Sequence, residues 1–193
     1  MMRHLEKSGL RVHFDYSVWL PQVAERDLSG EFDVIYGHFP ITRYVGPNYR
    51  YIALVRDPME RCLSSYKFHR KFGVENPHQT DFYSRVGRWI DRGELSVREY
   101  VRICPDMRST YQYFLGHWPR ERFDLVGTTE RYGDFLAMLS ALLGVTFTNN
   151  IRERQSEEKV DIPPEDVAPI KSLLAAEYAW VRSVTTAYQT QAA

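Results

Sequence analysis

The chain has 193 residues, which is enough for one domain with a buried core; 44% of them are hydrophobic and 26% are charged. The formal net charge is zero at pH 7, which argues against bulk binding to nucleic acid or to an anionic membrane surface. The two cysteines, Cys62 and Cys104, exclude a disulfide framework, and no Cys/His spacing suits a metal site. The sequence opens with no signal peptide and has no membrane-length apolar run, so we expect a soluble, cytoplasmic protein.

Short segments that are apolar throughout predict the strands of a buried sheet. They lie at residues 33–36 (DVIY), 51–55 (YIALV) and 123–126 (FDLV), with a weaker fourth at 11–14 (RVHF). Strands that are apolar on both sides, rather than on alternate residues, are typical of a parallel sheet covered on both faces.

The clearest predicted helix begins at Asp57 and Pro58, because aspartate is a good N-cap and proline is favoured at the first helical position. Its apolar residues follow the spacing i, i+3, i+4, i+7 and form one stripe for the core: Met59, Cys62, Leu63 and Tyr66. We interpret its basic residues as a solvated face, which could also attract an anionic glycan: Arg61, Lys67, Arg70 and Lys71.

Further helices are predicted on the C-terminal side. The region of about 80–115 is helical and includes a capping-box pattern from Ser96 to Glu99. A second clear helix covers 131–143 and ends at Gly144. Residues 148–164 are expected to form a long loop. A last helix covers about 166–187, with Pro169 tolerated near its first turn.

The alternation of strands and helices predicts one α/β domain over 1–193, a three-layer structure with a mostly parallel sheet flanked by helices. In such sheets ligands bind beyond the carboxyl ends of the strands. Two predicted strands end next to residues that can do chemistry, His38 and Arg56.

Arg56 adjoins a predicted helix N-terminus, where free N–H groups and the helix dipole favour an anion. Its guanidinium is a planar fork suited to phosphate, and the hydroxyl of Ser64 lies off the apolar stripe, so these residues predict a phosphomonoester clamp. The alternatives stay open: an ion pair of Arg56 with Asp57 or Glu60, an ordinary surface serine, and a hydrogen-bonded strand-end histidine at 38.

Residues 54–66 (LVRDPMERCLSSY) resemble the 3′-phosphate-binding motif of sulfotransferases that use 3′-phosphoadenosine 5′-phosphosulfate. Within that family the chain is most similar to carbohydrate enzymes of the heparan sulfate 2-O type. Three further segments are similar to parts of that subgroup: 36–39 (YGHF), 107–116 (MRSTYQYFLG) and 123–143 (FDLVGTTERYGDFLAMLSALL).

The resemblance implies a P-loop NTPase-like fold and the transfer of a sulfuryl group from that donor to a hydroxyl acceptor, a carbohydrate in this subgroup, with no metal. It implies that Arg56 and Ser64 contact the 3′-phosphate and that His38 is the catalytic base. Arg152 and Arg154 are candidate contacts to the donor phosphates or to an anionic acceptor. The oligomeric state is left open.

The family begins with a strand and a lysine-containing, Gly/Ser/Thr-rich loop that holds the 5′-phosphosulfate, and this sequence shows neither. We interpret residues 3–8 as the tail of the helix that follows that loop, and expect an N-terminally truncated domain. Two alternatives remain: a non-catalytic nucleotide-binding relative, and a P-loop kinase-like protein, although no G-x-x-x-x-G-K-[ST] string occurs.

Overall fold

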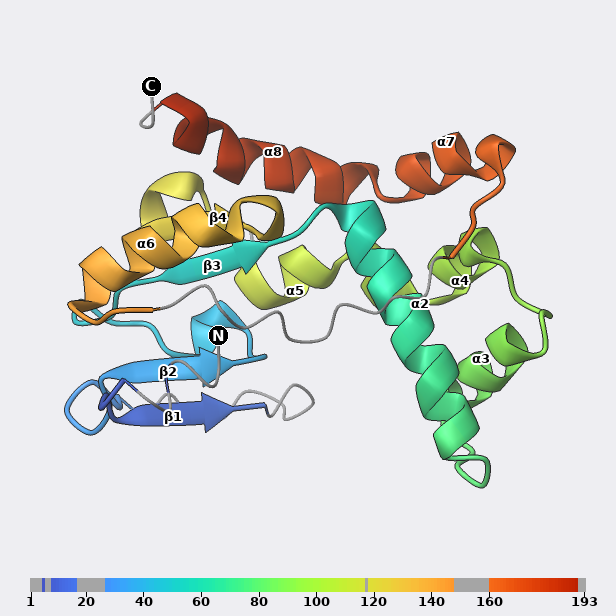
Figure 1. The fold of residues 1–193 in the computed structure, drawn as a ribbon, viewed down its shortest axis with the longest axis horizontal. Coiled ribbons are helices and arrows are strands. Elements are labelled where there is room, and N and C mark those ends of the chain that lie inside the picture. The colour runs from blue at the N-terminus through green and yellow to red at the C-terminus, as the bar shows by residue number, and fades with distance from the viewer. Residues whose placement is uncertain (1–4, 6–7, 17–26, 117, 148–159, 191–193) are drawn as a thin grey trace. The chain divides into compact units, whose positions relative to one another are not determined.

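The computed structural model describes residues 5, 8–16, 27–116, 118–147 and 160–190, without the side chains of 186–190. The chain divides into two compact units. The first unit comprises Met1–Val55, Tyr111–Glu153 and Arg182–Ala193, and the second comprises Arg56–Thr110 and Arg154–Val181. Figure 1 labels their elements.

The described part of the first unit contains four short strands that pair in parallel. β1 (Val12–Asp15) pairs with β2 (Val34–Gly37), and β3 (Ile52–Val55) pairs with β4 (Leu125–Thr128). These are the predicted strands, displaced by one or two residues. Within the described residues they form two two-stranded sheets rather than one continuous sheet. The mixed α/β class with parallel strands is therefore confirmed, while the three-layer P-loop-like architecture and the truncation stay predictions.

One helix supplies much of the first unit's core. Helix α6 (Tyr132–Leu143) ends at Gly144, whose φ of 67° is the left-handed conformation that the sequence predicted for this C-cap. The buried core combines residues of β4 and α6 with one residue near the N-terminus and one after α6: Leu5, Leu125, Phe135, Leu136, Leu139 and Phe147. Short helical segments complete this part of the chain: η1 (Ile41–Arg43), α5 (Thr110–Leu115), η3 (Arg120–Arg122) and η4 (Thr129–Arg131).

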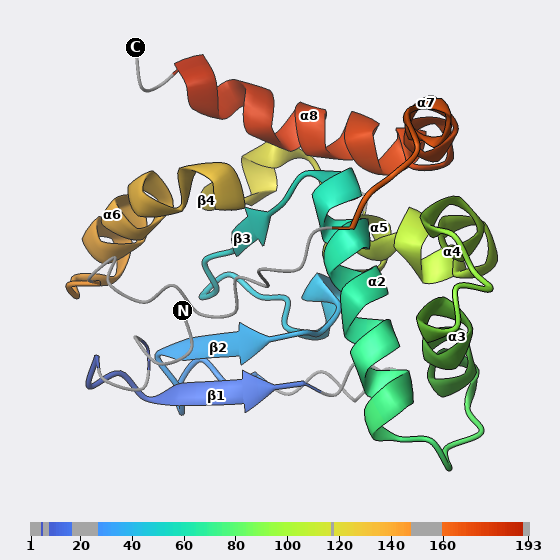
Figure 2. The ribbon, with the colours of Figure 1, turned by 45° about the vertical axis from the view of Figure 1, so that its right-hand side comes forward.

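The second unit is helical. Its elements are α2 (Pro58–Glu75), α3 (Phe82–Asp91), α4 (Val97–Ile103), η2 (Pro105–Arg108), α7 (Pro164–Leu173) and the start of α8 (Ala175–Thr190). The capping box of Ser96 and Glu99 is present at the start of α4. Figure 2 shows α2 and α3 side by side. No helix among the described residues is long and apolar enough to cross a membrane.

The prediction of one C-terminal helix over 166–187 is wrong. The helical pattern is interrupted at Leu174, which is the C-cap of α7 and precedes α8. Because α7 begins at Pro164, Pro169 lies inside it, beyond the first turn, and its missing N–H removes one hydrogen bond of that helix. Ile170 before the break and Leu174 at the break are buried, and Tyr178 of α8 packs against the same core, so both helices are held to the core of this unit.

Arg61 does not belong to the solvated face that its sequence neighbourhood suggested. Its side chain is 12% exposed and its Nη2 lies 3.3 Å from Oε2 of Glu177, whose side chain is 1% exposed. The same guanidinium donates to the Thr110 hydroxyl at 2.6 Å and to the Met107 carbonyl at 2.5 Å. A buried ion pair with additional hydrogen bonds therefore links α2 to η2 and to α8 inside the second unit.

We expect Glu177→Ala to destabilise the protein, because it leaves the Arg61 guanidinium buried without its carboxylate. Breaking one partner of a buried pair typically costs about 3–5 kcal/mol of the free energy of unfolding. Urea denaturation followed by circular dichroism measures this change. The matched control is Glu165→Ala, an exposed acid in the first turn of α7, for which about 1 kcal/mol or less is expected. Equal losses in the two variants would show that the pair has no special role.

Candidate functional site

Each of the main predicted site residues follows a strand or lies on the helix after it. His38 directly follows β2 in the first unit, while Arg56 follows β3 and belongs, with Ser64, to the second unit. Arg152 and Arg154 lie outside the described residues.

Arg56 lies just before α2 and is 39% exposed. Its Nη2 is 3.1 Å from Oε2 of Glu60, which is 56% exposed. This ion pair is one of the two that the sequence left open for Arg56. Ion pairs at such exposure contribute about 0.2–1 kcal/mol, so an anionic ligand can displace the carboxylate at small cost.

The N–H groups at the start of α2 are not free, contrary to the sequence-based prediction. The Asp57 carboxylate accepts hydrogen bonds from the N–H groups of Met59 at 2.8 Å and Glu60 at 3.1 Å. Pro58 has no N–H, and the N–H of Arg61 donates to the Asp57 carbonyl at 2.9 Å. The capping aspartate thus occupies the donors that an anion would otherwise use. An anion at this end of α2 must be held by side chains.

A second interaction fixes the capping carboxylate. The Tyr178 hydroxyl donates to the same Asp57 oxygen at 3.2 Å. Burial, together with the negative charge and hydrogen bond of Asp57, raises the pKa of Tyr178 to about 12, so the phenol stays protonated and remains a donor. The start of α2 is therefore held in place from two sides.

Ser64 is exposed on α2, four residues after Glu60, which itself is four residues after Arg56. Side chains four apart on a helix lie on one face, with Cβ atoms about 5–6 Å apart. The opposite stripe of the helix is buried, with Cys62 fully inaccessible as predicted. Arg56, Glu60 and Ser64 thus follow one another along the outward face at the start of α2, and we call them the α2 face.

His38 lies against two aromatic rings of its own unit. Its ring is 5.6 Å from that of Tyr16, edge to face, and 6.1 Å from that of Phe114. The residue as a whole is exposed, but the partial loss of water around the ring lowers the pKa of His38 below its ordinary 6.5. The imidazole is therefore neutral at physiological pH and able to accept a proton.

The backbone before this histidine leaves no room for a side chain. A Cβ on Gly37 would overlap the carbonyl oxygen of Asp15, because β1 and β2 pair directly at this point. The N–H of His38 then donates to the same carbonyl at 2.9 Å. Because Gly37 has no side chain, the hydrogen bond from the His38 N–H to the Asp15 carbonyl can form, and this bond fixes the backbone position of residue 38.

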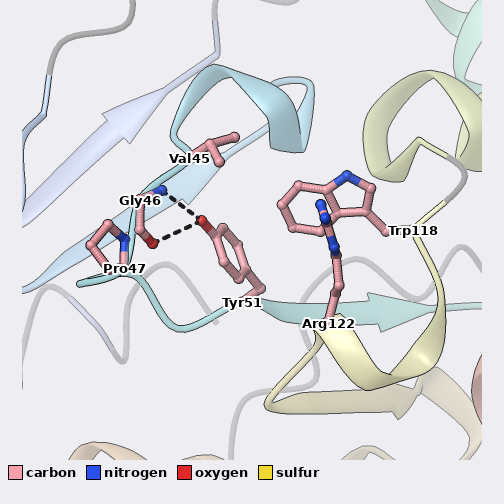
Figure 3. A pocket seen from close by; sticks show the side chains of 6 residues that line it. All are labelled: Val45, Gly46, Pro47, Tyr51, Trp118 and Arg122. Atoms are coloured by element: carbon pink, nitrogen blue, oxygen red, sulfur yellow. Dashed lines mark hydrogen bonds between the residues drawn. The ribbon is translucent and has the colours of Figure 1, made fainter.

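A pocket of about 400 Å³ lies elsewhere in the first unit, and sequence analysis did not find it. It joins two separated segments and is lined by Val45, Gly46, Pro47, Tyr51, Trp118 and Arg122 (Figure 3). Tyr51 directly precedes β3, and Arg122 comes shortly before β4. The pocket is therefore at the amino ends of these two strands, away from the carboxyl ends where the predicted site residues follow.

The chain is similar to two curated proteins, the uronyl 2-sulfotransferases of Homo sapiens and Mus musculus. Each is 32% identical over 126 residues, a region that covers 53% of this chain and 30% of the relative. The chain thus spans about three tenths of the length of these curated relatives. No family model and no solved structure matches the chain. This partial similarity is to proteins of the sulfotransferase class that the motif at 54–66 resembles.

Proposed function

We propose that this protein transfers a sulfuryl group from 3′-phosphoadenosine 5′-phosphosulfate to a hydroxyl of a carbohydrate. The observation that carries the proposal is the half-exposed guanidinium of Arg56 at the start of α2, in a segment that resembles the 3′-phosphate-binding motif. The similarity to two uronyl 2-sulfotransferases supports the same class of reaction and favours an acceptor that contains uronic acid.

The binding step uses the α2 face. The 3′-phosphate of the donor replaces the Glu60 carboxylate at Arg56, whose planar fork can form two parallel hydrogen bonds to phosphate oxygens. The Ser64 hydroxyl donates a further hydrogen bond from the next turn of the helix. Because Asp57 already occupies the backbone donors, these two side chains carry the recognition.

The chemical step is an in-line displacement at sulfur. His38 accepts the proton of the acceptor hydroxyl, the acceptor oxygen forms a bond to sulfur, and the bond from sulfur to the donor's phosphate oxygen breaks. Adenosine 3′,5′-bisphosphate leaves with the electron pair of that bond. Positive groups stabilise the charge that grows on the leaving phosphate, and we assign Arg152 and Arg154 to this role or to an acidic acceptor. No metal takes part in this scheme.

Two other functions would use the same residues. A non-catalytic relative would bind adenosine 3′,5′-bisphosphate without transferring sulfate, and a P-loop kinase-like protein would transfer phosphate. The kinase is the weaker alternative, because the sequence contains no G-x-x-x-x-G-K-[ST] string. Sulfate transfer to a uronate-containing glycan, as opposed to nucleotide binding alone, separates the first alternative from the proposal.

Arg56→Ala is expected to weaken the binding of adenosine 3′,5′-bisphosphate by about tenfold or more, because a charge-assisted contact to the 3′-phosphate is lost. Isothermal titration calorimetry measures the affinity. Arg70→Ala is the matched control, since Arg70 is a half-exposed arginine on the same helix, beside Asp91. Unchanged affinity in Arg56→Ala would remove this residue from the nucleotide site and end the proposal.

Glu60→Gln should raise the affinity for adenosine 3′,5′-bisphosphate by up to about fivefold, because the phosphate no longer competes with a carboxylate for Arg56. The same titration of Glu75→Gln provides the control, since Glu75 forms an exposed i,i+4 pair with Lys71 on the same helix. If Glu60→Gln binds more weakly than wild type, Glu60 helps to bind the nucleotide instead of competing with it.

The imidazole of His38 is expected to titrate below 6.5, and its pKa should rise toward 6.5 in Phe114→Ala, where water reaches the ring more freely. Nuclear magnetic resonance of the histidine side chains measures both values. Since the base works in its neutral form, the transfer rate should rise with pH through this lowered pKa and be level by neutral pH. A measured pKa well above 6.5 would contradict the desolvated environment of His38.

A further inference from the structure

The pocket at the amino ends of β3 and β4 contains a cation that is already oriented. Cζ of Arg122 lies 4.9 Å from the centroid of the Trp118 ring, so the guanidinium lies over the indole (Figure 3). A guanidinium has five N–H donors, and one that is held over an aromatic ring keeps donors with which it can bind an anion. No carboxylate in the described part of the chain forms an ion pair with Arg122, although the residue is exposed.

The walls of the pocket are held by contacts of their own. The Tyr51 hydroxyl accepts from the Gly46 N–H at 3.1 Å, and the Tyr51 N–H donates to the Asp124 carboxylate at 2.8 Å. The Tyr51 ring meets the Trp118 ring edge to face, with centroids 4.8 Å apart. Asp124, two residues after Arg122, is thus engaged with the backbone, and the two aromatic rings pack against each other.

The chemistry of the lining indicates the kind of ligand. Most of the surface is apolar, from Val45, which is 50% exposed, Pro47 and the two aromatic rings, and the charged group is the guanidinium at one side. A purely apolar ligand would leave the charge of Arg122 unused. A ring with C–H faces and one carboxylate satisfies both parts, since arginine binds a carboxylate through two parallel hydrogen bonds. A hexuronate sugar has this form.

The pocket lies away from His38, the proposed catalytic base. His38 follows the carboxyl end of β2, whereas the pocket lies at the amino end of β3, and the arrows of β2 and β3 point the same way in Figures 1 and 2. A sugar bound beside Tyr51 is therefore not the sugar that reacts at His38.

We propose that the pocket of Tyr51, Trp118 and Arg122 binds a uronate residue of the acceptor glycan at a distance from the reacting sugar. This inference rests on the proposed glycan acceptor, but it concerns a different site. Simultaneous contact at two places on one polymer raises the affinity for long chains without any change at the reaction centre. The pocket would in this way favour polymers with regularly spaced uronates over short acceptors.

The test uses an oligosaccharide of about ten sugars with glucuronate at every second position, and the same oligosaccharide with its carboxyl groups reduced to alcohols. Calorimetry of the full chain should show that Arg122→Gln weakens binding of the acidic oligosaccharide by about tenfold. Arg122→Lys should show a similar loss, since lysine keeps the charge but not the planar fork. The reduced oligosaccharide should bind weakly and equally to all variants.

Arg85→Gln, at an exposed arginine of α3, is the control for general attraction of a polyanion. A loss in Arg85→Gln as large as in Arg122→Gln would overturn the inference, as would wild-type affinity in Arg122→Gln or equal binding of the acidic and reduced oligosaccharides. Adenosine 3′,5′-bisphosphate binding should be unchanged in Arg122→Gln. If Arg56→Ala kept its nucleotide affinity instead, the proposed function would fail while the glycan pocket could still be detected.

Discussion

The proposed nucleotide site depends on where α2 begins. The Asp57 carboxylate caps the helix through the N–H groups of Met59 and Glu60, and Pro58 supplies the first helical residue. This start leaves Arg56 outside the helix and directs Glu60 and Ser64 to the same outward face. The buried stripe of Met59 and Cys62 on the other side of the helix keeps this face turned outward. The capping carboxylate and the buried stripe together therefore set the positions of the phosphate-binding groups.

The local charge of the α2 face explains how a protein of zero formal net charge can hold a multiply charged nucleotide. Without a ligand, Arg56 forms an ion pair with Glu60, and the Asp57 carboxylate accepts hydrogen bonds from the N–H groups at the start of α2. The other arginine of this segment, Arg61, is turned into the interior toward Glu177. Binding of a phosphate thus exchanges one anion for another at Arg56, and the net field of the protein contributes little to it.

The elements that sequence analysis predicted well are those determined by neighbouring residues. The four strands, the start of α2, the capping box at Ser96 and the glycine cap at Gly144 follow from local patterns, and the structure contains all of them. The interactions that it missed join residues far apart in the chain. Arg61 meets Glu177 and Asp57 meets Tyr178 across more than a hundred positions, and no pattern in 57–66 reveals either partner. Sequence analysis missed the pocket for the same reason, since its lining combines the segment around 45–51 with Trp118 and Arg122.

The close contact of α2 with α3 limits which residues the second unit can carry where the two helices meet. A Cβ placed on Gly73 would lie 2.7 Å from the backbone carbon of Gly87, and one placed on Gly87 would overlap the carbonyl oxygen of His69. Backbones this close leave no space for a side chain between them, so α2 and α3 pack as one rigid pair at this point. A larger residue at either position would force the two helices apart.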